Sequence, residues 1–276
     1  MLDRSQHDTY QKDGFLIKSG YFSPARIDSL AAEIVTLEGK DRSGRIVERS
    51  GEPNSIYITE QEPALYAFAT QPRLAALAGD LLQAPVYLHQ AKLNSKVALR
   101  GSAVEWHRDF DFWNRLDGMP DSAALTVAVF IDAVDAHNAP LLLIPGSHLS
   151  QAAGTDEEAA GAQGAQGEAD GANVGSWVGA ERAGESTIVG DLKYVVGAQE
   201  IVEPIIAAQG EVGTAVVFHS NLIHGSGCNM SPRGRRILFA SFNRASNALR
   251  PVQNPRPPYI ANRNFTLLPA DGQETQ

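Results

Sequence analysis

The sequence predicts a mainly β protein with packed helices, in which a helical N-terminal third precedes a jelly-roll-like sandwich or barrel. Amphipathic helical spacing is concentrated before residue 84. From residue 84 onward, short runs of β-branched and apolar residues are separated by glycine and proline. Because the helices come first and the strands later, we expect the helices to cover the outside of the β core.

The helices are predicted from the spacing of apolar residues. Ser23 and Pro24 favour a helix start, because serine caps a helix and proline fits its first turn. Apolar residues then recur every three or four positions up to Gly39, namely Ile27, Leu30, Ile34 and Leu37. A second helix is expected from Pro72 to Leu81, and a short helix at 63–68 before it.

The strands are predicted from short apolar runs at 86–93, 124–131, 141–144, 214–218 and 237–242. The run at 124–131 is apolar at nearly every position, which is typical of a strand covered on both faces. Residues 151–175 are dominated by glycine, alanine and acidic residues and predict a mobile surface loop or lid within a single domain spanning 1–276. The tail after Pro251 is expected to follow the surface as extended chain.

Composition limits the partners and the compartment. The 276 residues carry 32 acidic and 23 basic side chains, a net charge of −9, which argues against nucleic acid or an anionic membrane surface as the main partner. A lone cysteine, Cys228, excludes an internal disulfide framework and a cysteine-based zinc site. The sequence lacks a run of eighteen apolar residues and an N-terminal apolar signal core, so we expect a cytoplasmic protein with no membrane partner, either monomer or homodimer.

A His-x-Asp motif and a distant histidine predict a metal site. His107 and Asp109 are two positions apart, so on a strand both side chains point to the same face. His224 lies in a glycine-rich turn after a strand and could supply a third ligand. Two histidines and one carboxylate leave three positions open on a metal, which suits Fe(II) with 2-oxoglutarate in two positions and dioxygen in the third. Taken alone, His-x-Asp more often forms a hydrogen-bonded pair in a loop.

A candidate carboxylate anchor follows the distal histidine. Arg235 comes eleven positions after His224, at the entry to the next predicted strand. Its planar guanidinium could bind the far carboxylate of 2-oxoglutarate through two parallel hydrogen bonds, and Ser226 could add a hydroxyl donor. Because Arg236 is adjacent, a shift of one residue in register would exchange the two arginines.

Five segments together resemble the phytanoyl-CoA dioxygenase superfamily: 86–94, 106–120 (WHRDFDFWNRLDGMP), 140–148, 224–232 and 242–249. Within the superfamily the chain resembles bacterial free-proline trans-4-hydroxylases most, and ectoine hydroxylases somewhat less. The resemblance runs from about residue 10 to about residue 265 and is weakest at 150–200. The resemblance implies a double-stranded β-helix, or jelly-roll, core with iron near one mouth.

The resemblance also implies roles for individual residues. His107, Asp109 and His224 match the iron ligands, which makes them the catalytic centre. Arg235 and Ser226 match the residues that hold the 2-oxoglutarate carboxylate. Gln90 and Asn94 match positions on the strand that lines the cosubstrate and substrate pocket, and Trp113, Phe218 and Phe239 match aromatic positions that enclose a small cyclic substrate.

Some of these residues also have plainer interpretations. Trp113, Phe218 and Phe239 are equally compatible with ordinary core positions. His89 and His148 are expected to be structural, and His219 to lie at the surface or behind the ligands.

The chain departs from its relatives at three positions near the pocket rim. His219 stands where an acid is common, Asn114 replaces a histidine, and Ala139 replaces a glycine. These differences bear on the substrate more than on the reaction. Because Asp109 is present, a halide has no vacant carboxylate position on the iron, which favours hydroxylation over halogenation.

The predicted activity is that of an Fe(II)/2-oxoglutarate-dependent dioxygenase with dioxygen as cosubstrate. It would hydroxylate an unactivated C–H of a small free amino acid or related metabolite, proline- or ectoine-like, and release succinate and CO2. Polar anchors for such a substrate are available in Gln90, Asn94 and an arginine such as Arg115 or Arg244. Two alternatives stay open: a tailoring oxygenase that hydroxylates, desaturates or cyclises a larger secondary metabolite, and a non-catalytic jelly roll that binds a small molecule.

Overall fold

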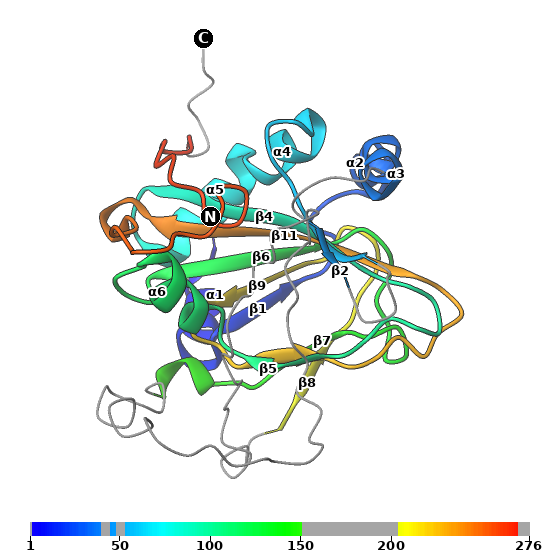
Figure 1. The fold of residues 1–276 in the computed structure, drawn as a ribbon. Helices are drawn as coiled ribbons and strands as arrows, with labels where there is room; N and C mark the ends of the chain where they lie inside the picture. Colours follow the sequence, from blue (N-terminus) through cyan, green and yellow to red (C-terminus); the bar gives the residue numbers. More distant parts are fainter. Residues whose placement is uncertain (1, 40–44, 48–52, 151–203, 270–276) are drawn as a thin grey trace, which may run out of the picture.

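A computed structural model describes residues 2–39, 45–47, 53–150 and 204–269. Two antiparallel sheets face each other as a jelly roll (Figure 1). The larger sheet has the strand order β1-β9-β6-β11-β4-β3-β2, and the smaller sheet has the order β5-β10-β7-β8. The predicted fold class is confirmed for these residues, whereas the predicted loop or lid at 151–175 lies outside them.

The first four strands belong to the larger sheet, and the chain then passes back and forth between the two sheets. The larger sheet contains β1 (Phe15–Lys18), β2 (Arg45–Val47), β3 (Pro53–Tyr57), β4 (Val86–Lys96), β6 (Ala124–Phe130), β9 (Ala215–His219) and β11 (Arg235–Arg244). The smaller sheet contains β5 (Val104–His107), β7 (Leu141–Leu143), β8 (Ile206–Ala208) and β10 (His224–Ser226).

Four helices cover the outer face of the larger sheet (Figure 1). They are α2 (Pro24–Asp28), α3 (Ala31–Gly39), α4 (Pro63–Ala69) and α5 (Pro72–Leu82). The predicted start at Ser23 is confirmed, because its hydroxyl accepts the Arg26 N–H at 3.3 Å. The single helix expected from there to Gly39 is wrong: it is divided after Asp28, where the Ser29 hydroxyl donates to the Arg26 carbonyl at 2.7 Å and competes with the helical pattern.

Two further helices escaped the sequence prediction. Helix α1 (Arg4–Asp13) is polar and buries only Tyr10, so it has no apolar stripe to detect. Its capping box, formed by Asp3 and Gln6, was the available signal. Helix α6 (Asp109–Asp117) follows β5 directly and begins with a predicted metal ligand.

Strand β6 explains how the layers are joined. Leu125, Val127 and Val129 pack against the helices, whereas Ala128 and Phe130 face the smaller sheet. Strands β9 and β11 alternate in the same way, so the larger sheet is covered on both faces, as its apolar runs predicted.

Strand β4 breaks this apolar rule on one face only. A break in the β4–β11 register between Leu88 and Gln90 shifts the alternation by one residue. Leu88 and Leu93 therefore both pack under the helices, whereas Gln90, Lys92 and Asn94 lie on the opposite, inward face. The interior of the sandwich is therefore apolar toward β9 and polar toward β4.

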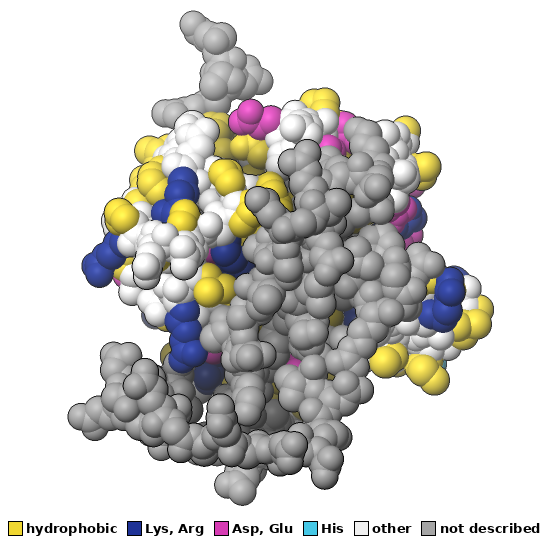
Figure 2. Space-filling model, viewed as in Figure 1, with side chains coloured by type: hydrophobic (Ala, Val, Ile, Leu, Met, Phe, Trp, Pro, Cys, Tyr) yellow, Lys and Arg dark blue, Asp and Glu magenta, His cyan; other side chains and the backbone are white. Residues whose placement is uncertain are grey.

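Within the described residues, no helix combines the length and the apolar character needed to cross a membrane. On the described part of the face shown in Figure 2, lysine and arginine side chains are interspersed with apolar and uncharged ones. This described part of the face shows no continuous band of lysine and arginine side chains.

Removing a buried side chain from the helix-covered face of β6 should destabilise the fold. Leu125 is fully buried there, so Leu125→Ala is expected to lower the free energy of unfolding by about 3 kcal/mol in urea denaturation. Val35→Ala is the control, because Val35 is 64% exposed and should change stability by less than about 0.5 kcal/mol. Equal effects of the two substitutions would contradict the proposed packing of the helices on β6.

Candidate active site

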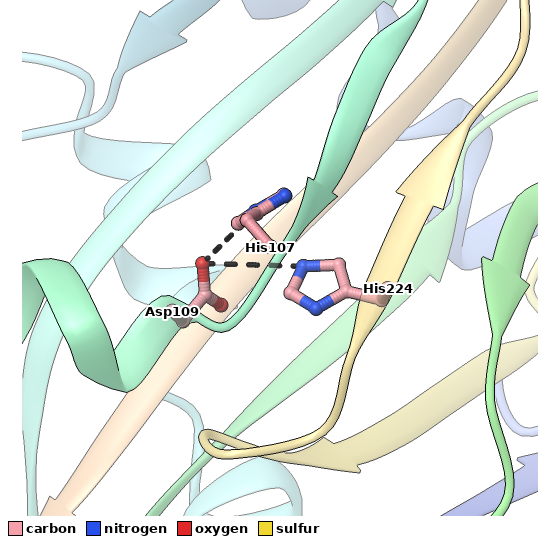
Figure 3. Close-up of side chains that lie close together, drawn as sticks. All are labelled: His107, Asp109 and His224. Carbon is pink, nitrogen blue, oxygen red and sulfur yellow. Dashed lines mark ion pairs between the residues drawn. The ribbon is translucent and has the colours of Figure 1, made fainter. Parts of the chain in front are cut away.

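Three elements bring His107, Asp109 and His224 together (Figure 3). His107 ends β5, Asp109 begins α6, and His224 begins β10. Strands β5 and β10 pair antiparallel with His224 directly opposite His107. One ligand atom from each of the three side chains lies within 4.8 Å of the others, so the predicted cluster is present as a geometric unit.

The predicted strand for both residues of the His-x-Asp motif is wrong, although the two side chains still converge. The strand ends at His107, and Asp109 is already helical. Arg108 between them keeps an extended backbone, with φ −111° and ψ 128°, so the alternation of a strand continues for one step past its end. The Arg108 side chain is fixed by donating to the Asn221 carbonyl at 3.1 Å and to the Ser150 hydroxyl at 2.8 Å.

Backbone carbonyls set the tautomer of both histidines. Nδ1 of His107 lies 2.8 Å from the Glu105 carbonyl oxygen, and Nδ1 of His224 lies 3.0 Å from that of Leu222. A carbonyl only accepts, so Nδ1 carries the proton and Nε2 keeps its lone pair. The two Nε2 atoms lie 3.5 and 3.9 Å from Oδ1 of Asp109. Two imidazole Nε2 atoms and one carboxylate oxygen facing a common space fit a divalent metal ion.

The charge states of the cluster also fit a metal site. Burial raises the pKa of Asp109, but nearby His224, His107 and Lys92 outweigh it and hold this pKa below its usual range. Burial, followed by the neighbouring His107, lowers the pKa of His224 to about 4, so this imidazole is neutral at pH 7. Thr126 donates to the second oxygen of Asp109 at 3.4 Å and hydrogen-bonds Ser241 at 2.8 Å, which orients the carboxylate.

The register question for the two arginines is answered by burial. Arg235 is 1% exposed and faces inward, whereas Arg236 pairs with Asp132 at 2.8 Å on the opposite side of β11. The Arg235 guanidinium donates to Oδ1 of Asn94 at 2.7 Å and twice to the Ala139 carbonyl, at 3.1 and 2.7 Å. Ala139 has a positive φ of 65°, a backbone conformation that glycine adopts without the steric cost of a Cβ.

Lys92 was missed by the sequence prediction. It lies between Gln90 and Asn94 in the inward alternation of β4, and its ammonium lies 5.5 Å from the Phe239 ring centroid. Burial lowers the pKa of Lys92, and the Asp109 carboxylate opposes that shift. The spacing of two positions from both predicted pocket residues was the signal that could have identified it.

The sequence profile of the phytanoyl-CoA dioxygenase (PhyH) family matches residues 10–237. The chain belongs to this family. The resemblance inferred from the motifs is thereby confirmed for most of the chain.

Named relatives within the phytanoyl-CoA dioxygenase family give the comparison more detail. The chain is 31% identical to the ectoine dioxygenase of Bordetella parapertussis over 95% of its own length and 83% of that protein. It is 37% identical to the L-proline trans-4-hydroxylase of Streptomyces griseoviridis over 72% of its length and 70% of that protein. The crystal structure of EctD from S. alaskensis with 2-oxoglutarate and 5-hydroxyectoine superposes with a TM-score of 0.76 at 28% identity, covering 98% of this chain and 87% of that one.

The three predicted aromatic residues have different neighbours. The Phe218 ring packs 4.7 Å from His224, and Phe239 lies beside Lys92. Trp113, in α6, is 2% exposed and packs edge-on against His89 at 4.9 Å. Ser226 is buried on β10, two positions after His224 and on the same face of that strand.

The arginines expected to anchor a substrate are not beside the cluster. Arg115 is exposed, and Arg244 donates to the Leu82 carbonyl at 2.8 Å. Arg256, which the sequence did not single out, is nearer: its positive charge acts on the pKa of Lys92 and of Tyr57, although burial is the larger influence on both.

His219 lies outside the cluster, as its alternation with Phe218 predicted. Its ring contacts Tyr10 and His148, at centroid distances of 6.5 and 5.3 Å, and its Nδ1 accepts the Asn221 N–H at 3.0 Å. Burial, followed by the nearby His148, lowers the pKa of His219 to about 4.

Stability of the metal-free protein should therefore fall in mild acid. His219 and His224 have folded pKa values of about 4 against 6.5 for the ordinary group, so the unfolded chain binds more protons between those values. Each contributes stability that is present above pH 6.5 and is lost toward pH 4, at up to about 1.4 kcal/mol per pH unit.

Urea unfolding measured from pH 7 to pH 4.5 checks this slope. His219→Gln should reduce it, whereas His137→Gln, at a side chain that is 81% exposed, should leave it unchanged. A free energy of unfolding that stays constant over this range would contradict the buried, neutral state of both histidines.

Proposed function

We propose that this chain is an Fe(II)/2-oxoglutarate-dependent dioxygenase that hydroxylates a small free amino acid or a related carboxylate-bearing metabolite. The observation that carries the proposal is the convergence of His107, Asp109 and His224, with both Nε2 atoms aimed at the Asp109 carboxylate. When bound, the iron with 2-oxoglutarate and dioxygen would supply the oxidant for an unactivated C–H and release succinate and CO2.

The three side chains would hold the metal on one side only. Nε2 of His107, Nε2 of His224 and Oδ1 of Asp109 would each supply one ligand atom. Three protein ligands leave the remaining positions of an Fe(II) ion for the cosubstrate and dioxygen. The hydrogen bonds at Nδ1 and at the second Asp109 oxygen fix these ligands before the metal arrives.

The inward cationic residues fit a dianionic cosubstrate. Arg235 would hold the far carboxylate of 2-oxoglutarate, with the Ser226 hydroxyl as a further donor. The Asn94 side chain, which accepts from Arg235 at 2.7 Å, would fix the orientation of the guanidinium. Lys92 would add positive charge between that anchor and the metal.

The substrate would occupy the space beside Gln90, Trp113 and Phe239. Ectoine and L-proline, named for two of the relatives, are both small ring compounds with a carboxylate. A zwitterion of this class needs polar anchors together with apolar walls. Gln90 on β4 supplies a polar group, and the aromatic rings supply the walls.

A turnover screen by mass spectrometry tests the proposed reaction. Purified protein with Fe(II), ascorbate and 2-oxoglutarate would be offered L-proline, pipecolate, ectoine and the common amino acids. We expect one product that is heavier by one oxygen, formed with equal succinate. Asp109→Ala should lower the rate by at least about 100-fold, because it removes a metal ligand.

The other outcomes of this screen discriminate between the two alternative functions. Succinate formed without an oxygenated product would indicate that the substrate is a larger metabolite outside the panel. Bound iron with neither succinate nor product would contradict an oxygenase acting on this panel and favour a non-catalytic binding protein.

Replacing the proposed carboxylate anchor should affect the cosubstrate selectively. Arg235→Gln is expected to raise the KM for 2-oxoglutarate at least about 30-fold, because a buried charge-assisted pair is worth about 2 kcal/mol or more. Arg236→Gln is the matched control, since that side chain leaves β11 on the opposite side and pairs with Asp132. A similar increase in KM for both variants, or none for Arg235→Gln, would contradict the assignment.

A further inference from the structure

A C-terminal segment, residues 250–263, closes over the end of α6 that is remote from the metal cluster. It lies beyond residue 237, where the family match ends, and contains neither helix nor strand. Its backbone is nevertheless tied to the protein: Arg250 N–H donates to the Gly118 carbonyl at 2.8 Å, and Asn262 N–H donates to the His89 carbonyl at 2.9 Å. A Cβ at Gly118 would lie 2.4 Å from the Arg250 carbonyl oxygen, so the segment and the helix end are in close contact.

A buried ion pair joins this segment to α6. Arg256 donates from Nε and Nη2 to the two carboxylate oxygens of Asp117, at 2.8 and 2.6 Å. The Asp117 side chain is completely buried, and Nε2 of His89 lies 3.4 Å from its Oδ2. Arg263 in the same segment donates to the Asp117 carbonyl at 2.9 Å. The last residue of α6 is therefore held from β4 and from the C-terminal segment together.

Helix α6 is also tied down at its first turn, where Phe110 N–H donates to the Ser220 carbonyl at 2.9 Å. Its apolar side chains belong to a small cluster that is separate from the two main cores, and Trp113 is the one that is fully buried. The helix has nine residues, about 13 Å of length, with Asp109 at one end and Asp117 at the other. Phe112 between them packs 6.1 Å from the His107 ring. A change in the tilt of α6 at Asp117 would therefore displace Asp109 directly and His107 through its contact with Phe112.

We propose that Asp117 and Arg256 are positioning residues for the metal site, and that the C-terminal segment is a functional part of it. Their ion pair fixes the orientation of α6, so that Asp109 meets His107 and His224 at the geometry observed. His89 lies beside the pair on β4 and also packs against the Trp113 ring. This contact fixes the rotation of the helix about its axis. This inference rests on the proposed function, because it assigns the two residues to the same metal ligands.

Fe(II) affinity measured by calorimetry without dioxygen tests the inference independently of turnover. Asp117→Asn and Arg256→Gln should each weaken Fe(II) binding about tenfold, while circular dichroism shows a folded protein. Arg256→Lys should recover part of the affinity, because it restores the charge but not the two-point contact.

Arg236→Gln is the matched control for this experiment. It removes a similar two-point arginine–aspartate pair, with Asp132 at 2.9 and 2.8 Å, far from α6 along the chain and in the sheet. It should bind Fe(II) like the unmodified protein even if its thermal stability falls.

Three results would overturn the inference. The first is unchanged Fe(II) affinity in both Asp117→Asn and Arg256→Gln. The second is an equal loss of Fe(II) affinity in Arg236→Gln, which would show that the effect comes from general destabilisation. The third is a raised substrate KM with unchanged Fe(II) affinity in Arg256→Gln, which would assign Arg256 to the substrate directly. Failure of the unmodified protein to bind Fe(II) would instead contradict the proposed function, and the inference would fall with it.

Discussion

Two backbone carbonyls, those of Glu105 and Leu222, determine what the cluster can bind. Each accepts a hydrogen bond from Nδ1 of a histidine and so orients its Nε2 toward the space beside Asp109. This works only because β5 and β10 pair with His107 and His224 in register, so that the two rings lie 4.2 Å apart. The smaller sheet therefore supplies the histidines, and the larger sheet supplies their chemical surroundings through Thr126 on β6 and Lys92 on β4.

The larger sheet must satisfy two opposite demands. Its outer face is apolar and buried under α2–α5, and its inner face carries polar residues at the β4 and β11 end. Buried polar groups are costly unless they are paired, which is why Arg235 is held by Asn94 and the Ala139 carbonyl. The free-energy cost of burying the positive charges of Arg235 and Lys92 is lower when an anion binds beside them. These buried charges are therefore complementary to a dicarboxylate cosubstrate.

Sequence alone predicted the layers and the candidate ligand residues His107, Asp109 and His224, because both depend on local patterns. The strands buried on both faces have nearly continuous apolar runs, the helix at 72–82 has a strong helical periodicity, and His107, Asp109 and His224 lie in recognisable motifs. Helix α1 was missed because its contacts are polar. The strand expected through Asp109 was wrong because two-residue alternation does not reveal where a strand becomes a helix. Lys92 was missed although its spacing from Gln90 and Asn94 was a usable local signal, whereas Arg256 was missed because its contact with Asp117 is a tertiary one that no local pattern encodes.

The most direct test of the central claim is the metal dependence of cosubstrate binding. Calorimetry without dioxygen would titrate 2-oxoglutarate into the metal-free protein and into the protein loaded with Fe(II). The account predicts binding of one 2-oxoglutarate per chain that is tight only with Fe(II) and is lost in His224→Ala. Equal binding with and without the metal, or Fe(II)-dependent binding that survives in His224→Ala, would contradict it.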